Sequence, residues 1–256
     1  SNIKKVISGS NKITTLKINN LYSKIIKAGL HIAPSIKVAE ASKIIENVQR
    51  DVNISLMNEF ATIFEKMKID TKEVLDAAST KWNFLNFKPG LVGGHCIGVD
   101  PYYLAYKSEK NGYKPRVLLN GRKVNNNISK NIFKSIKRKS VEKGIKLEES
   151  SILILGITFK ENCSDIRNSR VVNLHSHFKK ISNMVDLYDP LAKRNEVFKS
   201  FGIKLIDKIS KKYNIVILAV AHDEFLKIRF KNILEKNYIL YDVKSILPKK
   251  LVTLRL

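Results

Sequence analysis

The feature that most limits how this chain can fold is an alternation of short apolar runs and helical stretches in its C-terminal part. Strands that alternate with helices at this spacing form a parallel, doubly wound sheet. Such sheets bind ligands beyond the carboxyl ends of their strands. The sequence therefore predicts an α/β fold with a ligand site at those ends. The expected strands are Ile152–Leu155, Val185–Tyr188, Ile215–Val220 and Ile239–Val243, the expected helices between them include Arg170–Lys180 and Leu191–Phe201, and the segments that follow the strands begin at Gly156, Asp189, Ala221 and Lys244.

A long amphipathic helix is expected over residues 36–67, with Ser35 as its N-cap. At a rise of 1.5 Å per residue, such a helix measures about 48 Å. An apolar face of that length forms either the spine of a domain or the core of a dimer. Lys43 and Asn47 lie on the opposite face, and taken alone this polar line indicates only exposure to solvent.

The other segments are shorter. Residues 3–33 are typical of a strand, a helix and a second strand, and they resemble the end of an α/β domain. Helices are also expected over Lys72–Ala78 and Tyr102–Glu109, one or two basic helices are expected over 115–142, and a linker follows them.

The net charge of +24 raises the possibility of nucleic-acid binding. Only 9 of the 47 basic residues are Arg, the residue preferred for contacts with phosphates and bases, and the lysines are spread along the chain. We therefore expect a solvated basic surface and no nucleic-acid partner. No apolar run approaches a membrane span or a secretion signal, so we expect a cytoplasmic protein without membrane contact.

The segment from Gly90 to Pro101 is the strongest candidate for chemistry. Its glycines allow the backbone to approach a ligand closely, and Cys96 follows them with Asp100 four residues later. If a helix begins at Ile97, the two side chains share a face and the helix N-terminus favours a thiolate. Adjacent side chains rarely face each other, so a Cys–His pair between His95 and Cys96 is not expected. Nor is a zinc site, because no further ligand has suitable spacing.

Three motifs resemble the UDP-glucose/GDP-mannose dehydrogenase family in order and spacing. The resemblance is greatest to the UDP-N-acetylhexosamine 6-dehydrogenases that make uronic acids for bacterial surface polysaccharides, and it extends from about Ile3 to Pro248. The motifs are Lys43-x-x-x-Asn47, Gly93-Gly94-His95-Cys96-Ile97-x-x-Asp100-Pro101 and Gly156-x-x-Phe159-Lys160-x-x-x-x-Asp165-x-Arg167.

This resemblance implies that the C6 alcohol of a UDP-sugar is oxidised to a uronate and that two NAD are consumed. Cys96 would bind the intermediate aldehyde as a thiohemiacetal, which a second hydride transfer converts to a thioester that water cleaves. Asp100 would serve as the base for that water. Lys43 would stabilise the oxyanion, with Asn47 beside it.

The family also implies which residues bind the ligands. Phe159, Lys160 and Lys244 match positions that contact the substrate, and the loop Phe87–Gly93, which includes Gly90, matches the segment that wraps the sugar. Arg167 and Gly94 match positions near the cofactor.

The resemblance divides the chain into the end of an NAD-binding α/β domain (1–33), a central helical dimerisation and catalytic domain (34–147) and a Rossmann-like UDP-binding domain (148–256). The central helix would form a homodimer. No GxGxxG sequence occurs, and the family's catalytic Glu falls before the first residue of this sequence, so we expect the chain by itself to be inactive. The alternative is a non-catalytic, dimeric UDP-sugar-binding module.

Overall fold

The computed structural model describes residues 2–256. It divides into two units, the first ending at Arg50 and the second running from Asp51 to Leu256. The first unit contains strand β1 (Lys5–Ile7), helix α1 (Lys12–Ser23) and strand β2 (Leu30–Ile32), with β1 parallel to β2. The strand–helix–strand prediction for residues 3–33 is confirmed.

Helix α2 (Ile36–Met67) has the bounds that the apolar periodicity predicted. Ser35 caps it, because its Oγ accepts a hydrogen bond from the backbone N–H of Val38 at 3.3 Å. Part of the apolar face is exposed, including Ile45, Leu56, Ile63 and Met67. This exposure is compatible with the expected dimer core, which stays a prediction.

Three further helices follow in the second unit: α3 (Thr71–Ala78), α4 (Asp100–Lys110) and α5 (Arg116–Glu142). All three were predicted, and the segment before the sheet forms one continuous helix, α5. None of the helices described in residues 2–256 combines the length and apolar composition needed to cross a membrane.

A parallel sheet of five strands forms the C-terminal part, in the order β4-β3-β5-β6-β7. All four predicted strands are present: β3 (Ile152–Leu155) and β4 (Val185–Tyr188) have the expected bounds, whereas β5 (Tyr213–Leu218) and β6 (Leu234–Asp242) begin and end earlier than expected. Strand β7 (Leu254–Arg255) was not predicted, because its two residues carry no pattern and only its pairing with β6 makes it a strand.

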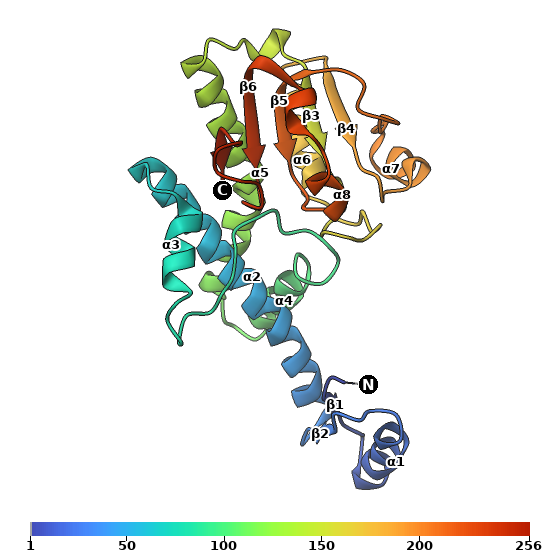
Figure 1. Ribbon diagram of the computed structural model, residues 1–256. Coiled ribbons are helices and arrows are strands. Elements are labelled where there is room, and N and C mark those ends of the chain that lie inside the picture. The colour runs from blue at the N-terminus through green and yellow to red at the C-terminus, as the bar shows by residue number, and fades with distance from the viewer. Residues whose placement is uncertain (1) are drawn as a thin grey trace. The chain divides into compact units, whose positions relative to one another are not determined.

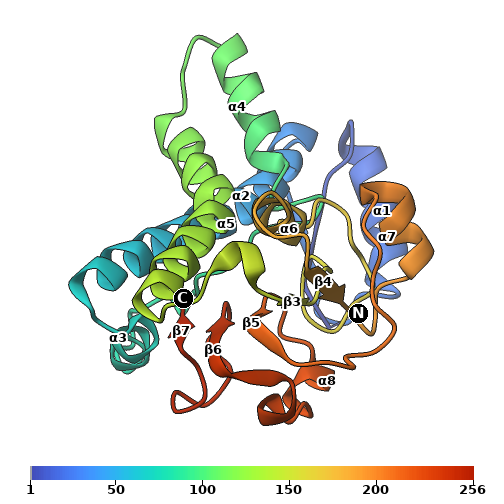
Figure 2. The same cartoon turned by 90° about the horizontal axis from the view of Figure 1, so that it is seen from above.

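The central strands β3 and β5 are buried on both faces of the sheet, which explains their apolar runs. Helices α5 and α6 (Val171–Lys179) cover one face, and α8 (Asp223–Leu226) and the 3-10 helix Phe230–Asn232 cover the other (Figures 1 and 2). Adjacent residues therefore enter different cores: Ile152 and Ile154 contact the α5–α6 layer, and Leu153 and Leu155 contact the α8 layer. The remaining elements are α7 (Arg194–Phe201) and the 3-10 helix Leu147–Glu149.

Candidate active site

The carboxyl ends of β3 and β5 lie side by side where the strand order reverses. Gly156 follows β3 directly and has a φ of 92°. A Cβ at this position would lie only 2.5 Å from the Cβ of Val220, just beyond β5. The glycine therefore allows the two strand ends to approach closely, and the chain leaves the sheet here in the loop that carries Phe159 and Lys160.

Asp189, at the carboxyl end of β4, holds the start of this loop. Its Oδ2 accepts a hydrogen bond from the backbone N–H of Ile157 at 2.7 Å, and its Oδ1 accepts one from Leu191 at 2.8 Å. Burial acts to raise the pKa of the Asp189 carboxyl, but hydrogen bonds from His222 and the backbone amides outweigh it, and the pKa is lowered. Asp189 is therefore a buried carboxylate that fixes the backbone beside the predicted substrate residues.

The structure brings Phe159, Lys160 and Lys244 together. They line one hollow at the carboxyl edge of the sheet, together with Glu161 and Arg170. The ammonium group of Lys160 lies 5.7 Å from the centre of the Phe159 ring. Three of the residues predicted to bind substrate thus share one surface, although they belong to segments that follow two different strands.

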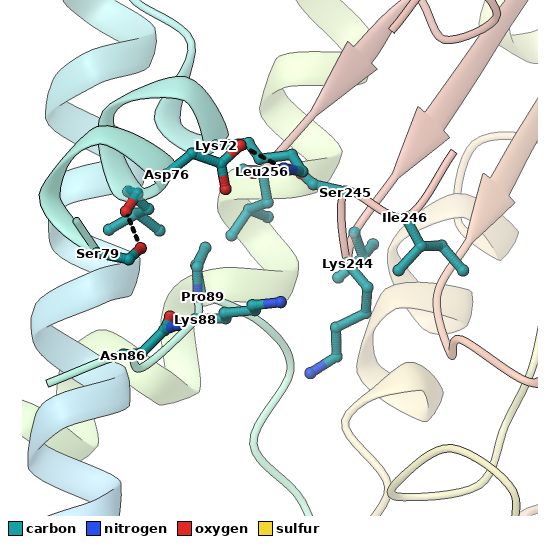
Figure 3. A pocket seen from close by; sticks show the side chains of 12 residues that line it. Lys72, Asp76, Ser79, Asn86, Lys88, Pro89, Lys244, Ser245, Ile246 and Leu256 are labelled. Carbon is teal, nitrogen blue, oxygen red and sulfur yellow. Dashed lines mark hydrogen bonds and ion pairs between the residues drawn. The ribbon is translucent and has the colours of Figure 1, made fainter. Parts of the chain in front are cut away.

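A second pocket lies between the loop before Cys96 and the segment after β6 (Figure 3). It encloses about 570 Å³, including the solvent at its mouth. The side chains of Lys88 and Lys244 both point into it. Burial lowers the pKa of Lys244, and the nearby charge of Lys88 lowers it further, whereas Glu161 acts to raise it. The pocket therefore places two cationic groups where an anion would relieve their repulsion.

Asp242 fixes the segment that carries Lys244. Its Oδ1 accepts a hydrogen bond from the backbone N–H of Lys244 at 3.0 Å, and its Oδ2 accepts one from Leu247 at 2.6 Å. Burial raises the pKa of the Asp242 carboxyl, although these backbone bonds oppose the increase. Asp242, at the end of β6, therefore holds the backbone of the segment that carries Lys244, just as Asp189 holds the start of the loop after β3.

The predicted sugar loop is anchored at Gly90 by Asn58 of α2. The Asn58 amide accepts a hydrogen bond from the N–H of Gly90 at 2.8 Å and donates one to its carbonyl at 3.1 Å. A Cβ at Gly90 would lie 2.9 Å from the Nζ of Lys244, so any larger residue would require the end of the Lys244 side chain to shift. Phe87 does not line the pocket, although Asn86 and Lys88 on either side of it do.

The turn before Cys96 packs against the loop after β3. A Cβ at Gly93 would lie 2.7 Å from the carbonyl oxygen of Asn168, and one at Gly94 would lie 3.0 Å from the ring of Phe159. The backbone N–H of Gly94 donates to the carbonyl of Arg167 at 3.2 Å. Both glycines therefore permit a close approach between two segments of this protein. The sequence had instead suggested that they allow the backbone to approach a ligand.

Cys96 is exposed at the end of this turn, and two expectations about it are wrong. The Nδ1 of His95 lies 3.2 Å from the Sγ of Cys96, so the adjacent side chains do meet. Adjacent residues point apart in a strand, but in a turn they diverge less, and the imidazole is long enough to reach the sulfur. The helix also begins at Asp100 rather than at Ile97. The carbonyl of Cys96 still accepts a hydrogen bond from the N–H of Asp100 at 2.9 Å, so the two residues are one helical turn apart.

Arg167 approaches Cys96 from the loop after β3. Its Nε donates to both carboxylate oxygens of Asp165 at 3.0 Å. The guanidinium holds the pKa of Asp165 well below its usual range, at about 2. Asp165 in turn raises the pKa of Arg167, and the charge of Cys96 adds a smaller increase. The cation predicted to reach a cofactor therefore lies near the thiol.

Lys43 and Asn47 belong to the first unit. Lys43 is exposed and forms an ion pair with Glu46, with 3.1 Å between Nζ and Oε2. Asn47 is buried. Their predicted role beside Cys96 stays a prediction.

Sequence reasoning assigned no individual role to Lys88, Asp189, His222 or Asp242, although it placed Lys88 in the sugar loop and the segments from Asp189 and Ala221 at the ligand edge of the sheet. The three that follow strands could have been suspected, because a polar residue at the carboxyl end of a buried parallel strand faces the usual ligand site. No arrangement of three or more His, Cys, Asp or Glu side chains suited to a metal ion occurs within residues 2–256.

Two domains of one known protein family match this chain. The central domain of the UDP-glucose/GDP-mannose dehydrogenase family matches residues 37–127, and the UDP binding domain of that family matches residues 153–249. The chain belongs to this family.

The curated relatives support the same assignment, and a solved structure shares the fold. A UDP-N-acetyl-D-glucosamine 6-dehydrogenase of Salmonella typhi is 47% identical over the whole of this chain and 61% of its own length. Protein CapL of Staphylococcus aureus is 46% identical over 96% of this chain and 58% of its own length. The chain therefore spans about three-fifths of the length of these two relatives. The structure of a UDP-D-ManNAc dehydrogenase from Pyrococcus horikoshii has the same fold, with a TM-score of 0.84 at 24% identity over 98% of this chain and 59% of its own.

Proposed function

We propose that this chain supplies the nucleotide-sugar site and the nucleophilic thiol of a dehydrogenase that oxidises the C6 alcohol of a UDP-N-acetylhexosamine to the uronate. One observation carries the proposal: the turn that bears Cys96 is hydrogen-bonded to the loop that bears Phe159 and Lys160. The relatives named as UDP-N-acetyl-D-glucosamine 6-dehydrogenases support the choice of substrate.

Lys160 and Lys244 are proposed to bind the diphosphate. Both line the hollow beyond the sheet, and Lys244 also extends into the neighbouring pocket beside Lys88. Ammonium groups bind phosphate oxygens through charge-assisted hydrogen bonds. Burial and, to a smaller extent, the charge of Lys88 lower the pKa of the partly buried Lys244, and a bound diphosphate would favour its charged form.

Cys96 is proposed to add its sulfur to the carbonyl carbon of a C6 aldehyde, and the carbonyl oxygen takes up a proton to give a thiohemiacetal. This adduct then loses a hydride (two electrons and a proton) from its carbon to the oxidant. With loss of the hydroxyl proton as well, it becomes a thioester. Water, deprotonated by Asp100, then attacks the thioester, releasing the uronate and returning the thiol. Lys43 and Asn47 are proposed to stabilise the oxyanion.

NAD is the oxidant that the family resemblance implies. Arg167 and Gly94 are the only residues assigned to it, and in the structure they contact Asp165 and the loop after β3. Without a glycine-rich dinucleotide turn in the sequence, these residues do not form a dinucleotide site, so the proposal is restricted to what the chain's own residues do.

Thiol alkylation tests the proposal on this chain directly. Cys96 is exposed next to His95 and Arg167, whereas Cys163 is partly buried and its Sγ donates to the carbonyl of Lys160 at 3.3 Å. Exposed thiols beside cations react faster. We expect iodoacetamide to label Cys96 several-fold faster than Cys163, as followed by peptide mass spectrometry, and UDP-N-acetylglucosamine to slow the labelling of Cys96.

Preferential labelling of Cys163, or a Cys96 rate that the UDP-sugar leaves unchanged, would contradict the proposal. Cys163→Ser is the matched control, because it removes the other thiol and should leave protection of Cys96 intact. In a protein that also carries a dinucleotide-binding domain, Cys96→Ser should abolish uronate release.

A further inference from the structure

His222 is a fully buried histidine at the point where the strand order reverses, and the proposed chemistry does not use it. It follows β5, and none of its surface is exposed. Its Nδ1 accepts a hydrogen bond from the backbone N–H of Asn162 at 2.9 Å. Its Nε2 lies 3.1 Å from the Oγ1 of Thr158 and 3.2 Å from the Oδ2 of Asp189. Both ring nitrogens are thus committed to neighbours.

These contacts fix where the ring carries its proton. The backbone N–H of Asn162 can only donate, so Nδ1 must be the acceptor and the proton lies on Nε2. Nε2–H then donates to the Asp189 carboxylate, and this bond helps to lower the pKa of Asp189. The hydroxyl of Thr158 is free to donate to the carbonyl of Lys160, which lies 2.9 Å away.

The ring therefore contacts both ends of one five-residue segment. Thr158 begins this segment, Asn162 ends it, and Phe159 and Lys160 lie between them. Asn162 is further held by accepting a hydrogen bond from the backbone N–H of Asp223 at 3.1 Å, and its φ of 55° is unusual for a residue other than glycine. A loop held at both ends, with the carbonyl of Lys160 bonded from within, has little freedom in the backbone that carries the Lys160 side chain.

We propose that His222 is a positioning residue for Lys160: by bridging the Asn162 amide and the Asp189 carboxylate, it holds the Lys160 ammonium in place for a nucleoside diphosphate. The inference rests on the proposed function, in which Lys160 binds the diphosphate. His222 acts through the loop and does not touch the ligand.

A double-mutant cycle on UDP affinity, measured by calorimetry with the whole chain, tests this role. Lys160→Ala should weaken UDP binding about ten-fold or more, the loss expected for a charge-assisted hydrogen bond. His222→Phe keeps a ring but removes both polar atoms, and it should weaken binding by a similar factor. In the Lys160→Ala background, His222→Phe should have almost no further effect, because the group that it positions is already absent.

Rescue and control variants separate positioning from simple stability. His222→Asn keeps an oxygen able to accept from the Asn162 amide, so it should restore part of the lost affinity. Tyr213→Phe removes a hydrogen bond to Asp186 elsewhere in the same sheet and should leave UDP affinity unchanged. If His222→Phe does not fold, His222→Asn takes its place in the cycle, and its smaller loss of affinity should likewise vanish in the Lys160→Ala background.

The outcomes distinguish the two proposals. Equal losses from His222→Phe with and without Lys160 would show that the ring does not act through Lys160 and would overturn the positioning role alone. An unchanged affinity in Lys160→Ala would overturn the proposed diphosphate role of Lys160, and the positioning role with it.

Discussion

Replacing Gly156 by alanine tests whether the close approach of β3 and β5 is set by the absence of one side chain. The new Cβ would lie 2.5 Å from the Cβ and 2.8 Å from the Cγ2 of Val220. Neither atom can move without its backbone or its packed neighbours, since Val220 is buried. The residue at 156 would also have to keep a φ of 92°, which is unfavourable for an L-amino acid.

Both effects lower the free energy of unfolding. A left-handed backbone costs a residue with a Cβ about 1–2 kcal/mol, and overpacking a filled core costs about 1–3 kcal/mol. The free energy of unfolding should therefore fall by about 2–5 kcal/mol, a large share of the roughly 5–15 kcal/mol available to a typical domain. For a chain of this size the loss corresponds to a Tm lower by roughly 10 °C.

Gly202→Ala is the matched control. Gly202 ends α7 with a φ of 68°, and a Cβ there would meet no atom within 4 Å. This variant should lose only the backbone part, about 1–2 kcal/mol. Calorimetry or circular dichroism melts of the two variants would be compared. Equal losses in the two variants would refute the packing argument.

Three further predictions concern charge and assembly. Arg167→Gln should lower Tm slightly at neutral pH, because it removes the partner that lowers the pKa of Asp165. The ion pair stabilises the fold only while the Asp165 carboxyl is ionised, so the difference in Tm from wild type should disappear as the pH falls from about 4 to about 2. A difference that persists unchanged at pH 2 would contradict this. Arg122→Met should lower the free energy of unfolding in urea by about 3–5 kcal/mol, because it leaves the buried Asp51 carboxylate without the cation that pairs with it. The double variant Asp51→Leu with Arg122→Met should recover most of that loss. Sedimentation should show a dimer at micromolar concentration, and Ile63→Glu, on the exposed apolar face of α2, should shift it towards monomer; a wild-type monomer would count against dimerisation through this helix.

Much of the local structure was predictable because it depends on short-range pattern. Helix α2 follows from apolar residues at helical spacing and from the cap at Ser35, and strands β3 and β5 follow from apolar runs. Both signals lie within the segment itself, so they can be interpreted without knowing what packs against it. Motif spacing likewise singled out Cys96 and Lys160.

Other features could not be predicted, because they depend on which distant segments meet. Strand β7 has no pattern of its own and exists through its pairing with β6. The contact between His95 and Cys96 depends on the local turn, which spacing alone does not specify.

What the sequence by itself determined is therefore the set of elements and the family motifs, because periodicity and spacing are properties of neighbouring residues. The tertiary structure alone decided that Gly94 packs against Phe159, that Asp242 fixes the segment of Lys244, and that His222 bridges both ends of the Lys160 loop. Asp242 accepts its hydrogen bonds from nearby backbone N–H groups at the carboxyl end of β6. The Gly94 and His222 contacts join residues about 60 or more positions apart. They form only when the strands align in register, because that alignment brings the carboxyl ends of separate strands to a common edge.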